Sequence, residues 1–293
     1  MSAKPVRLDF VGVGVAKSGT SWLAACLAAH PSVCVARPKE LNYFCERAIW
    51  PRYRVNNGLG PEWLAQRFSH CQAGQRLGEF SPNYFCDEQA PERICQHNPE
   101  CRLIFCLRHP VEVLVSFYHQ VRRESPVPDS FEAFLAEYPP IRQLGLFHFH
   151  IQRFLRRFPR EQCLFLLFED MQNDPAAAVK TTYSFLGIEP DFVPGELHRR
   201  VNEAQAPRSQ LLLSGIDLAR RVVQRATPSP VLQRVVWRLQ LHRLHDFLLR
   251  RNLQTLMPSE ISPQIRQELL NEYRADTQAL ATFLGRDLSR WQS

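Results

Sequence analysis

Several features that would place a protein in a common class are missing from this sequence of 293 residues. No apolar run approaches the ~20 residues that a membrane-spanning helix requires. The N-terminus lacks the succession of basic, apolar and small residues that is typical of a signal peptide, so we expect a cytoplasmic location. Nine cysteines form no C-x-x-C pair, which argues against a zinc ribbon or a disulfide framework and favours reduced thiols.

Lysine is also scarce, because arginine supplies 32 of the 36 cationic side chains. Two of the four lysines, Lys17 and Lys39, lie in the segments that carry the candidate site. The formal net charge of +7 suits an anionic ligand. Hydrophobic residues make up 45% of the chain and charged residues 22%, which is typical of a globular protein with a sizeable core.

Strand-like and helix-like segments alternate along the chain. Short β-rich or continuously apolar runs predict strands at residues 7–15, 33–35, 75–80, 102–107 and 162–168. Helical patterns predict helices at residues 22–29, 61–70, 88–97, 110–123, 130–137, 147–158, 174–186 and 262–284. Strands separated by helices imply βαβ units, so the sequence predicts an α/β fold of three layers, with a central parallel sheet flanked by helices.

We expect a single domain over residues 1–293, with a variable and largely helical segment at residues 193–260. Within it, residues 218–252 are rich in arginine, which favours an amphipathic helix packed on the domain. A lid over a substrate site and a membrane-surface or nucleic-acid role stay open for this segment. For the protein as a whole we predict no nucleic-acid partner and no transmembrane segment.

The most informative segment, Gly-Val-Gly-Val-Ala-Lys-Ser-Gly-Thr-Ser-Trp, covers residues 12–22. A strand that ends in a glycine-containing loop before a helix turns unpaired backbone N–H groups toward one point, which makes a phosphate site. Lys17 adds a mobile charge, and Thr20 and Ser21 add hydroxyl donors. The dinucleotide fingerprint G-x-G-x-x-G fails at Lys17. The Walker A pattern misses only its second glycine, replaced by Ala16, so a kinase or NTPase stays open.

Residues 17–23, Lys-Ser-Gly-Thr-Ser-Trp-Leu, resemble the 5′-phosphosulfate loop of the sulfotransferases that use 3′-phosphoadenosine 5′-phosphosulfate (PAPS). The resemblance implies a P-loop-like fold and a sulfonate transfer that leaves 3′-phosphoadenosine 5′-phosphate (PAP). It also implies that the loop binds the nucleotide through Lys17, Ser18, Gly19, Thr20, Ser21 and Trp22.

A second anion site is predicted where the strand at residues 102–107 ends. Arg108 stands at the carboxyl edge of the sheet, where doubly wound folds bind ligands, and its planar guanidinium suits a phosphate. Pro110 starts the next helix, and Ser116 can lie on the same side of its first turns. This arrangement resembles the family's 3′-phosphate motif, and two anion sites distinguish a 3′,5′-bisphosphate from ATP. Arg208, in a segment that resembles another part close to the nucleotide, is a further candidate.

Residues 37–44, Arg-Pro-Lys-Glu-Leu-Asn-Tyr-Phe, resemble the segment that supplies a glutamate as general base in heparan-type and related bacterial sulfotransferases. Glu40 matches that base, which would take the proton of an acceptor hydroxyl as it attacks sulfur. A surface carboxylate paired with Lys39 is the alternative interpretation. His109 and His119 compete for the role of base, because neutral histidine titrates in the right range.

The same resemblance implies an acceptor pocket with aromatic walls. Residues 78–85, Gly-Glu-Phe-Ser-Pro-Asn-Tyr-Phe, resemble another family landmark, in which some relatives carry a second catalytic lysine where this chain has Phe80. The departure argues against a polysaccharide acceptor of the heparan type and leaves Lys17 as the main cation at the reaction centre. We expect the pocket to be formed by Asn42, Tyr43, Phe44, Phe80 and Tyr84.

The resemblance therefore predicts a PAPS-dependent sulfotransferase that moves a sulfonate group to a hydroxyl of a small metabolite or natural product. Glu40 is the expected base, and Lys17 with the backbone N–H groups of residues 18–22 would neutralise charge on the leaving phosphate. We expect no metal. A P-loop kinase or NTPase acting on a small molecule is the alternative, and a non-catalytic nucleotide-binding domain is a second one. The sequence predicts no particular oligomeric state.

Overall fold

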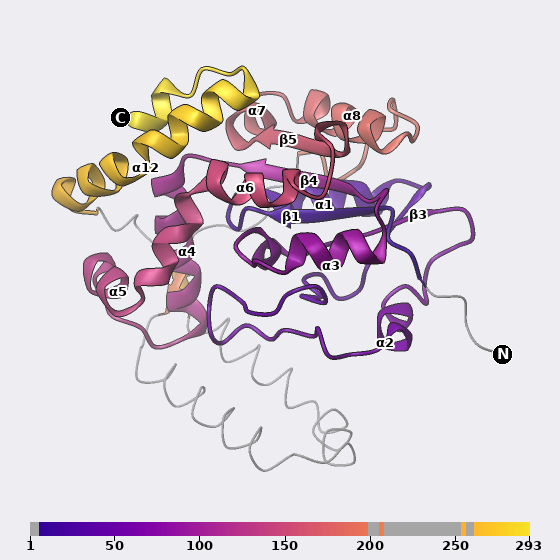
Figure 1. Ribbon diagram of the computed structural model, residues 1–293, viewed down its shortest axis with the longest axis horizontal. Coiled ribbons are helices and arrows are strands. Elements are labelled where there is room, and N and C mark those ends of the chain that lie inside the picture. Colours follow the sequence, from indigo (N-terminus) through magenta and orange to yellow (C-terminus); the bar gives the residue numbers. More distant parts are fainter. Residues whose placement is uncertain (1–5, 199–204, 208–252, 256–260) are drawn as a thin grey trace, which may run out of the picture. The chain divides into compact units, whose positions relative to one another are not determined.

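The computed structural model describes residues 6–198, 205–207, 253–255 and 261–293 (Figure 1). Arg208 and the arginine-rich residues 218–252 therefore lie outside the described residues. The chain divides into two compact units, and each is described by itself. The first consists of Met1–Leu114, Pro140–Val201 and Arg266–Ser293, and the second of Val115–Pro139 and Asn202–Ile265. One domain over residues 1–293 stays a prediction.

A five-stranded parallel sheet forms the centre of the first unit, as predicted. Its strands are β1 (Phe10–Gly14), β2 (Val33–Val35), β3 (Arg76–Phe80), β4 (Arg102–Leu107) and β5 (Cys163–Leu167). They lie in the order β2-β3-β1-β4-β5, and every pair is parallel. The chain places β2 and β3 on one side of β1 and β4 and β5 on the other. The carboxyl ends of β1 and β4 therefore lie at the topological switch point, where open α/β sheets bind ligands.

Helices connect the strands, as parallel pairing requires. The first unit contains α1 (Thr20–Ala29), α2 (Pro61–Gln66), α3 (Ala90–His97), α6 (Phe147–Leu155), α7 (Phe168–Asn173) and α8 (Pro175–Leu186), with the 3₁₀ turns η1 (Pro82–Phe85), η3 (Arg160–Gln162) and η4 (Ser289–Gln292). Three elements contribute residues to both units, namely α4 (Pro110–Glu124), η2 (Pro139–Gly145) and α12 (Pro263–Leu284). The second unit also contains α5 (Phe131–Glu137) and an antiparallel pair, β6 (Gln205–Pro207) and β7 (Leu253–Thr255).

One face of the sheet packs against α1 and α8. Phe10 of β1 and Ile104 of β4 are fully buried in an apolar cluster that includes Leu23 of α1 and Tyr183 of α8. The Tyr183 hydroxyl donates a hydrogen bond to the carbonyl oxygen of Cys26 over 3.0 Å, which ties the two helices together. In Figure 1, α1 lies behind the strands.

The opposite face packs against η1 and α6. The ring of Phe105 in β4 contacts Phe85 of η1, Phe154 of α6 and Phe165 of β5, with ring centroids 6.3, 5.3 and 4.7 Å apart. In Figure 1, α3 and α6 lie in front of the strands, so helices cover both faces of the sheet. The predicted three-layer α/β fold is therefore confirmed.

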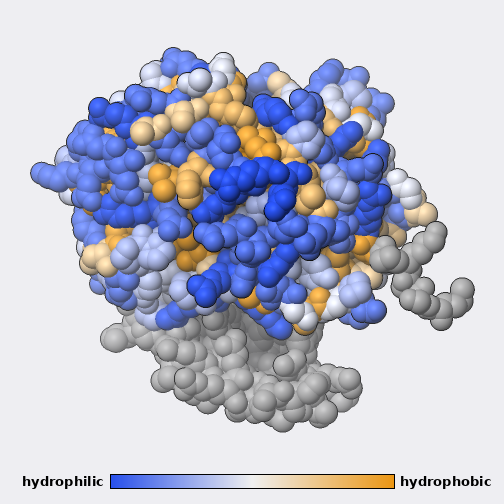
Figure 2. Space-filling model, viewed as in Figure 1, coloured by the Kyte–Doolittle hydropathy of each residue, from blue (hydrophilic) through white to orange (hydrophobic). Residues whose placement is uncertain are grey.

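The surface of the described residues is mainly hydrophilic on the face shown in Figure 2, where apolar residues form scattered groups. Phe149 and Val193 are the large apolar side chains that stand exposed in this part of the chain. None of the described helices combines the length and the apolar character that crossing a bilayer requires.

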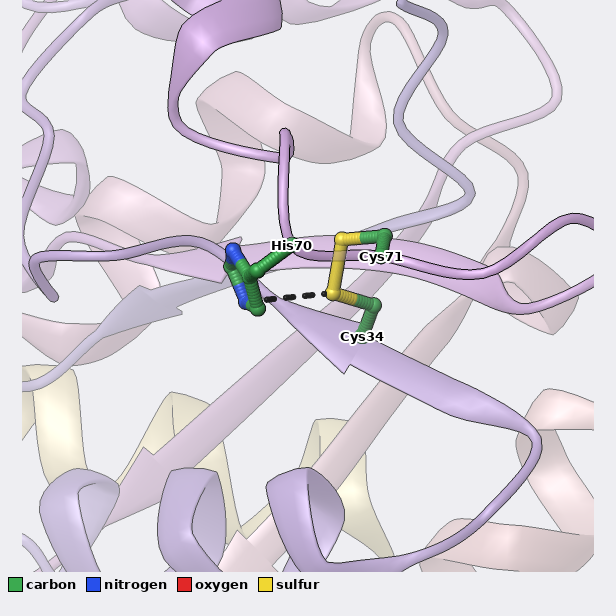
Figure 3. A group of neighbouring side chains, drawn as sticks. All are labelled: Cys34, His70 and Cys71. Carbon is green, nitrogen blue, oxygen red and sulfur yellow. Dashed lines mark hydrogen bonds between the residues drawn. A yellow bond between two sulfur atoms is a disulfide. The ribbon is translucent and has the colours of Figure 1, made fainter.

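A disulfide joins Cys34 of β2 to Cys71, which follows α2 (Figure 3). The expectation of reduced thiols throughout was therefore wrong for this pair, while the other seven cysteines are free. The two residues are 37 positions apart, and only the return of the chain from α2 to β3 brings their Cα atoms to 5.7 Å. No local spacing in the sequence could show this approach.

The expected elements agree with the structure in type, but some of their ends differ. The helix expected at residues 61–70 ends at Gln66, because hydrogen bonds between residues three apart carry the chain onward in tight turns as far as Cys71. The short helix α7 was not predicted, and neither were β6 and β7, which lie where the sequence favoured helix.

Gly78 of β3 lies under the ring of Phe10 of β1. A Cβ atom at position 78 would lie 2.2 Å from Cζ of this fully buried ring. We expect Gly78→Ala to lower the free energy of unfolding by ~1–3 kcal/mol, because the ring must be displaced. Gly58→Ala is the matched control, since no atom lies within 4 Å of its Cβ position. Equal free energies of unfolding for the two variants in urea would contradict this packing of β1 on β3.

Candidate active site

The loop between β1 and α1 has the geometry of an anion-binding turn. Lys17 and Gly19 have positive φ angles of 66° and 85°, which turn the chain sharply before α1 begins at Thr20. No side chain caps the start of α1, so the N–H groups of its first turn can donate to an anion at the positive end of the helix dipole. Ser18 is fully buried, and its hydroxyl has no hydrogen-bond partner within the described residues, which suits a group that binds a ligand.

Gly19 is required by the packing of α7 against this loop. A Cβ atom there would lie 3.2 Å from Met171 Cε and 3.3 Å from the ring of Phe168, both residues of α7. The positive φ angle disfavours any side chain as well. The loop therefore packs closely against α7 at Gly19.

Arg108 connects the second predicted anion site to this loop. It follows the last residue of β4, and its Nη1 donates a hydrogen bond to the carbonyl oxygen of Lys17 over 3.2 Å. The guanidinium lies 4.8 Å from the ring centroid of Phe168 and 3.8 Å from the carboxylate of Glu112. Burial lowers the pKa of Arg108, while Glu112 and Glu169 oppose that shift. Two segments 91 residues apart thus meet at the switch point of the sheet.

The other predicted nucleotide-binding residues that the structure describes lie in two helices. Thr20 is buried at the start of α1, and Ser21 and Trp22 beside it are half-buried. The indole Nε1 of Trp22 donates a hydrogen bond over 3.2 Å to the carbonyl oxygen of Leu197, so its ring is held against the segment that follows α8. Ser116 is a half-buried residue of α4 in the second unit.

Glu40 lies at the carboxyl end of the sheet, in the segment that follows β2. Its backbone N–H donates a hydrogen bond over 3.1 Å to the carbonyl oxygen of Phe80, the last residue of β3. Its side chain is 42% exposed, and Lys39 Nζ donates a hydrogen bond to Oε1 over 2.8 Å. The ion pair that the sequence left open as an alternative is therefore present.

A pocket of about 430 Å³ opens beside Glu40. Arginines, aromatic rings and polar groups dominate its wall, which consists of Pro38, Glu40, Leu41, Asn42, Arg52, Tyr53, Arg54, Asn56, Trp63 and Arg67. The guanidinium of Arg67 lies 4.4 Å from the ring centroid of Trp63, so a cation and a flat ring stand together in the wall. This chemistry suits a ligand that carries an anionic group.

The aromatic residues expected in the pocket lie elsewhere. Phe44, Phe80 and Tyr84 are 3%, 0% and 0% exposed, and all three pack in the core. Tyr43 is half-buried and stacks on Trp63, with ring centroids 6.0 Å apart. Of the expected set, Asn42 lines this pocket, and its wall combines the aromatic rings of Tyr53 and Trp63 with arginine and polar side chains.

A buried carboxylate that sequence reasoning did not single out supports this segment. Glu79 of β3 is fully buried, and its Oε2 accepts a hydrogen bond from the Ser81 hydroxyl over 2.8 Å. Ser81 Oγ in turn accepts one from the backbone N–H of Asn42 over 2.9 Å. The Tyr84 hydroxyl also bonds to Glu79, and it accepts a hydrogen bond from the backbone N–H of Tyr43 over 2.9 Å. These hydrogen bonds hold Asn42 and Tyr43, just beyond Glu40, against the carboxyl end of β3.

Burial raises the pKa of Glu79 to about 7, although the hydrogen bonds from Tyr84 and Ser81 oppose the shift. A carboxylate between Gly78 and Phe80, near the end of a predicted strand, is the sequence signal that could have found it.

The two histidines considered as bases are buried. His109 Nδ1 accepts a hydrogen bond from the backbone N–H of Val111 over 3.2 Å, and burial lowers its pKa. His109 does not line the pocket beside Glu40. His119 lies in the part of α4 that belongs to the second unit. Of the three candidates, Glu40 is the one found in the pocket wall.

Comparison with known proteins places these features in a family. The model of the sulfotransferase domain matches residues 8–207. Heparan sulfate glucosamine 3-O-sulfotransferase 3B1 of Mus musculus is 30% identical over 187 residues, which cover 60% of this chain and 45% of that protein. Heparan sulfate glucosamine 3-O-sulfotransferase 6 of Mus musculus is 32% identical over 185 residues, which cover 60% and 51%. The chain thus spans about half the length of these curated relatives.

Among solved structures, a sulfotransferase from Alicyclobacillus acidocaldarius matches with a TM-score of 0.68 and 23% sequence identity, covering 98% of this chain and 100% of that one. This likeness shows the fold, and it agrees with the P-loop-like arrangement expected from the loop after β1.

The raised pKa of Glu79 makes the stability of the protein depend on pH. The unfolded chain ionises this carboxyl near its ordinary value of 4.5, whereas the folded chain retains the proton up to about pH 7. Between these values the folded state binds more protons, so the free energy of unfolding falls as pH rises, by up to ~3 kcal/mol.

Glu79→Gln removes this titration, so the variant should gain stability relative to the wild type as pH rises through that range. Urea unfolding of both proteins at about pH 5 and about pH 7.5 measures the effect. Glu137→Gln, at an exposed position of α5, should leave the pH dependence of the wild type unchanged. A difference between wild type and Glu79→Gln that stays constant with pH would contradict a buried, titrating carboxyl.

Proposed function

The chain belongs to the family of sulfotransferase domains, and on that basis we propose that it transfers a sulfonate group from PAPS to a hydroxyl group of an acceptor. The observation that carries the proposal is the hydrogen bond from Arg108 to the carbonyl oxygen of Lys17. It joins the two segments that we propose to bind anions, which follow the carboxyl ends of β1 and β4. Two such segments suit a nucleotide with phosphates at both the 3′ and the 5′ position.

The residues present fit this nucleotide. Lys17, the hydroxyl of Ser18 and the N–H groups at the start of α1 would hold its 5′ end, and the buried Ser18 hydroxyl would gain the partner that it lacks in the described chain. Arg108 would hold the 3′-phosphate, and the role predicted for Ser116, which lies in the second unit, stays a prediction. When bound, PAPS supplies the sulfonate group on a phosphate that leaves as part of PAP.

Glu40 would act as the general base. It would accept the proton of the acceptor hydroxyl while the hydroxyl oxygen forms its bond to sulfur. Lys39 holds the carboxylate in place through the ion pair at 2.8 Å. Lys17 and the backbone N–H groups of residues 18–22 would neutralise the charge that grows on the leaving phosphate. In this mechanism, positioning and electrostatic stabilisation by the chain provide most of the acceleration.

We propose a small metabolite or natural product that carries an anionic group as the acceptor. The volume of about 430 Å³ suits a small molecule. Arg52, Arg54 and Arg67 in the wall would bind a carboxylate, phosphate or sulfate on the acceptor while its hydroxyl faces Glu40.

A kinase or NTPase is not favoured. The family model and the relatives are sulfotransferases, and Ala16 replaces the glycine that a Walker A loop requires.

Isothermal titration with PAP tests the nucleotide directly. We expect micromolar binding of PAP and none of ATP with magnesium. Lys17→Ala should weaken PAP binding and lower the turnover number by ~10²-fold or more, the effect of removing one preorganised donor. Lys180→Ala is the matched control, because Lys180 forms an exposed ion pair with Asp191. Binding of ATP with magnesium in preference to PAP would refute the proposal.

Glu40→Gln tests the base. The variant should bind PAP as the wild type does, while the transfer rate to hydroxylated acceptors, assayed with and without a carboxylate or phosphate group, falls by ~10²-fold or more. Glu137→Gln should keep the full rate. If Glu40→Gln also keeps it, the base is another residue, and His109 or His119 becomes the next candidate.

A further inference from the structure

The disulfide between Cys34 and Cys71 lies next to a histidine (Figure 3). His70 Nε2 is 3.3 Å from Cys34 Sγ, and the three donor atoms lie within 4.8 Å of one another. Cys34 is buried in β2, Cys71 is half-buried, and His70 is exposed. A reagent in solution can therefore reach the pair from the side of Cys71.

We propose that Cys34 and Cys71 form a reversible thiol–disulfide pair, in which His70 stabilises the Cys34 thiolate, and that a dithiol reductant opens this pair and loosens the wall of the neighbouring pocket. The effect on acceptor binding rests on the proposed function, whereas the chemistry of the pair does not.

The other cysteines differ from this pair in their surroundings. Burial raises the pKa to about 12 for Cys26, Cys86, Cys106 and Cys163. It also raises the pKa of Cys45 and Cys101. Such thiols are poor nucleophiles. Cys95 is half-buried and free, and it has no cysteine partner, so it provides a control.

The exchange reaction balances with a dithiol as co-reactant. A thiolate of the reductant attacks Cys71 Sγ, the S–S bond breaks, and Cys34 leaves as a thiolate that takes a proton from solvent. An N–H group of the His70 imidazole at 3.3 Å stabilises this leaving thiolate. The mixed disulfide joins Cys71 to the first sulfur of the reductant. The second thiol of the same reductant molecule loses its proton and attacks that first sulfur, and Cys71 leaves as a thiolate that takes up a proton. The net change is two protein thiols and one oxidised reductant.

Hydrogen bonds that do not depend on the disulfide join the segment after Cys71 to the segment before Cys34, and one more orders the turn that ends at Cys71. The N–H of Arg76 donates to the carbonyl oxygen of Ser32 over 2.8 Å, and Gln75 Nε2 donates to the carbonyl oxygen of Val33 over 3.2 Å. The N–H of Cys71 donates to the carbonyl oxygen of Phe68 over 3.0 Å. The reduced pair can therefore form the disulfide again without refolding of the chain.

The same two segments form part of the pocket wall. Pro38 and Glu40 follow Cys34 by four and six residues, and Arg67 precedes Cys71 by four. The N–H of Arg37 donates a hydrogen bond over 3.1 Å to the carbonyl oxygen of Arg67, beside the wall. The disulfide is thus a covalent bond between the segment that carries Glu40 and the segment that carries Arg67. After its reduction, the contacts between the two segments are non-covalent.

Alkylation under native conditions tests the chemistry. In protein purified in air, Cys34 and Cys71 should be unreactive toward iodoacetamide, and both should react after incubation with dithiothreitol, as mapped by peptide mass. Alkylation of both in untreated protein, or no gain after dithiothreitol, would overturn the proposal. One zinc ion bound per chain in place of the disulfide would overturn it as well.

His70→Ala tests the role of the imidazole. The disulfide should still form, but its reduction by dithiothreitol near neutral pH should be slower by roughly three- to tenfold, because the leaving thiolate loses its stabilising group. Cys95→Ser should not change the rate. An unchanged rate in His70→Ala would remove His70 from the proposal.

Hydrogen exchange tests the link to the pocket without any need for activity. The amides of Arg37 and Glu40, which are hydrogen-bonded in the structure, should exchange about tenfold faster after reduction. The double variant Cys34→Ser/Cys71→Ser should show the fast rate and no response to dithiothreitol, and its melting temperature should be lower by roughly 5–10 °C. Equal exchange in the two states would overturn the link. In an active enzyme, the KM for the acceptor should rise on reduction while the Kd for PAP stays constant.

Discussion

The pairing of β1 with β3 is the constraint on which the rest of the first unit depends. Each strand places a glycine opposite an aromatic residue of the other, Phe10 opposite Gly78 and Phe80 opposite Gly12. A Cβ atom would lie 2.0 Å from the Phe80 ring at Gly12 and 2.2 Å from the Phe10 ring at Gly78. A shift of register by one residue would place each ring opposite a residue that carries a side chain, for example Phe10 opposite Leu77 or Glu79, so the space that glycine leaves would be lost. This packing therefore decides where the loops that leave β1 and β3 meet.

The register brings the two chemical parts of the site to one edge of the sheet. The N–H of Ser81 donates to the carbonyl oxygen of Gly12 over 3.0 Å, and the N–H of Glu40 donates to that of Phe80 over 3.1 Å. The segment that carries Glu40 is thus attached to β3, while the loop that carries Lys17 follows β1. Because the strands are parallel, both leave the sheet at the same edge, where the end of β4 adds its arginine.

Position 80 is occupied by an uncharged residue, Phe80, at the end of β3. Phe80 is fully buried over Gly12, so this position serves packing and supplies no cation. The cations next to Glu40 come instead from the segments after β2 and α2, with Arg52, Arg54 and Arg67 in the pocket wall. The cationic groups of the pocket wall therefore come from parts of the chain other than β3. The disulfide between β2 and the turn after α2 stabilises that part.

The sequence by itself determined the features that depend on near neighbours in the chain. The alternation of strands and helices, the turn with Lys17 between β1 and α1, and the position of Arg108 directly after a strand were predictable, because each follows from a few consecutive residues. The tertiary structure decided the rest. Apolar periodicity cannot tell whether an aromatic ring faces the core or a pocket, so the burial of Phe44 was not predictable. The network around Glu79 and the disulfide of Cys34 depend on segments that meet only when the sheet forms, since the distances between them are set by strand order and not by spacing in the sequence.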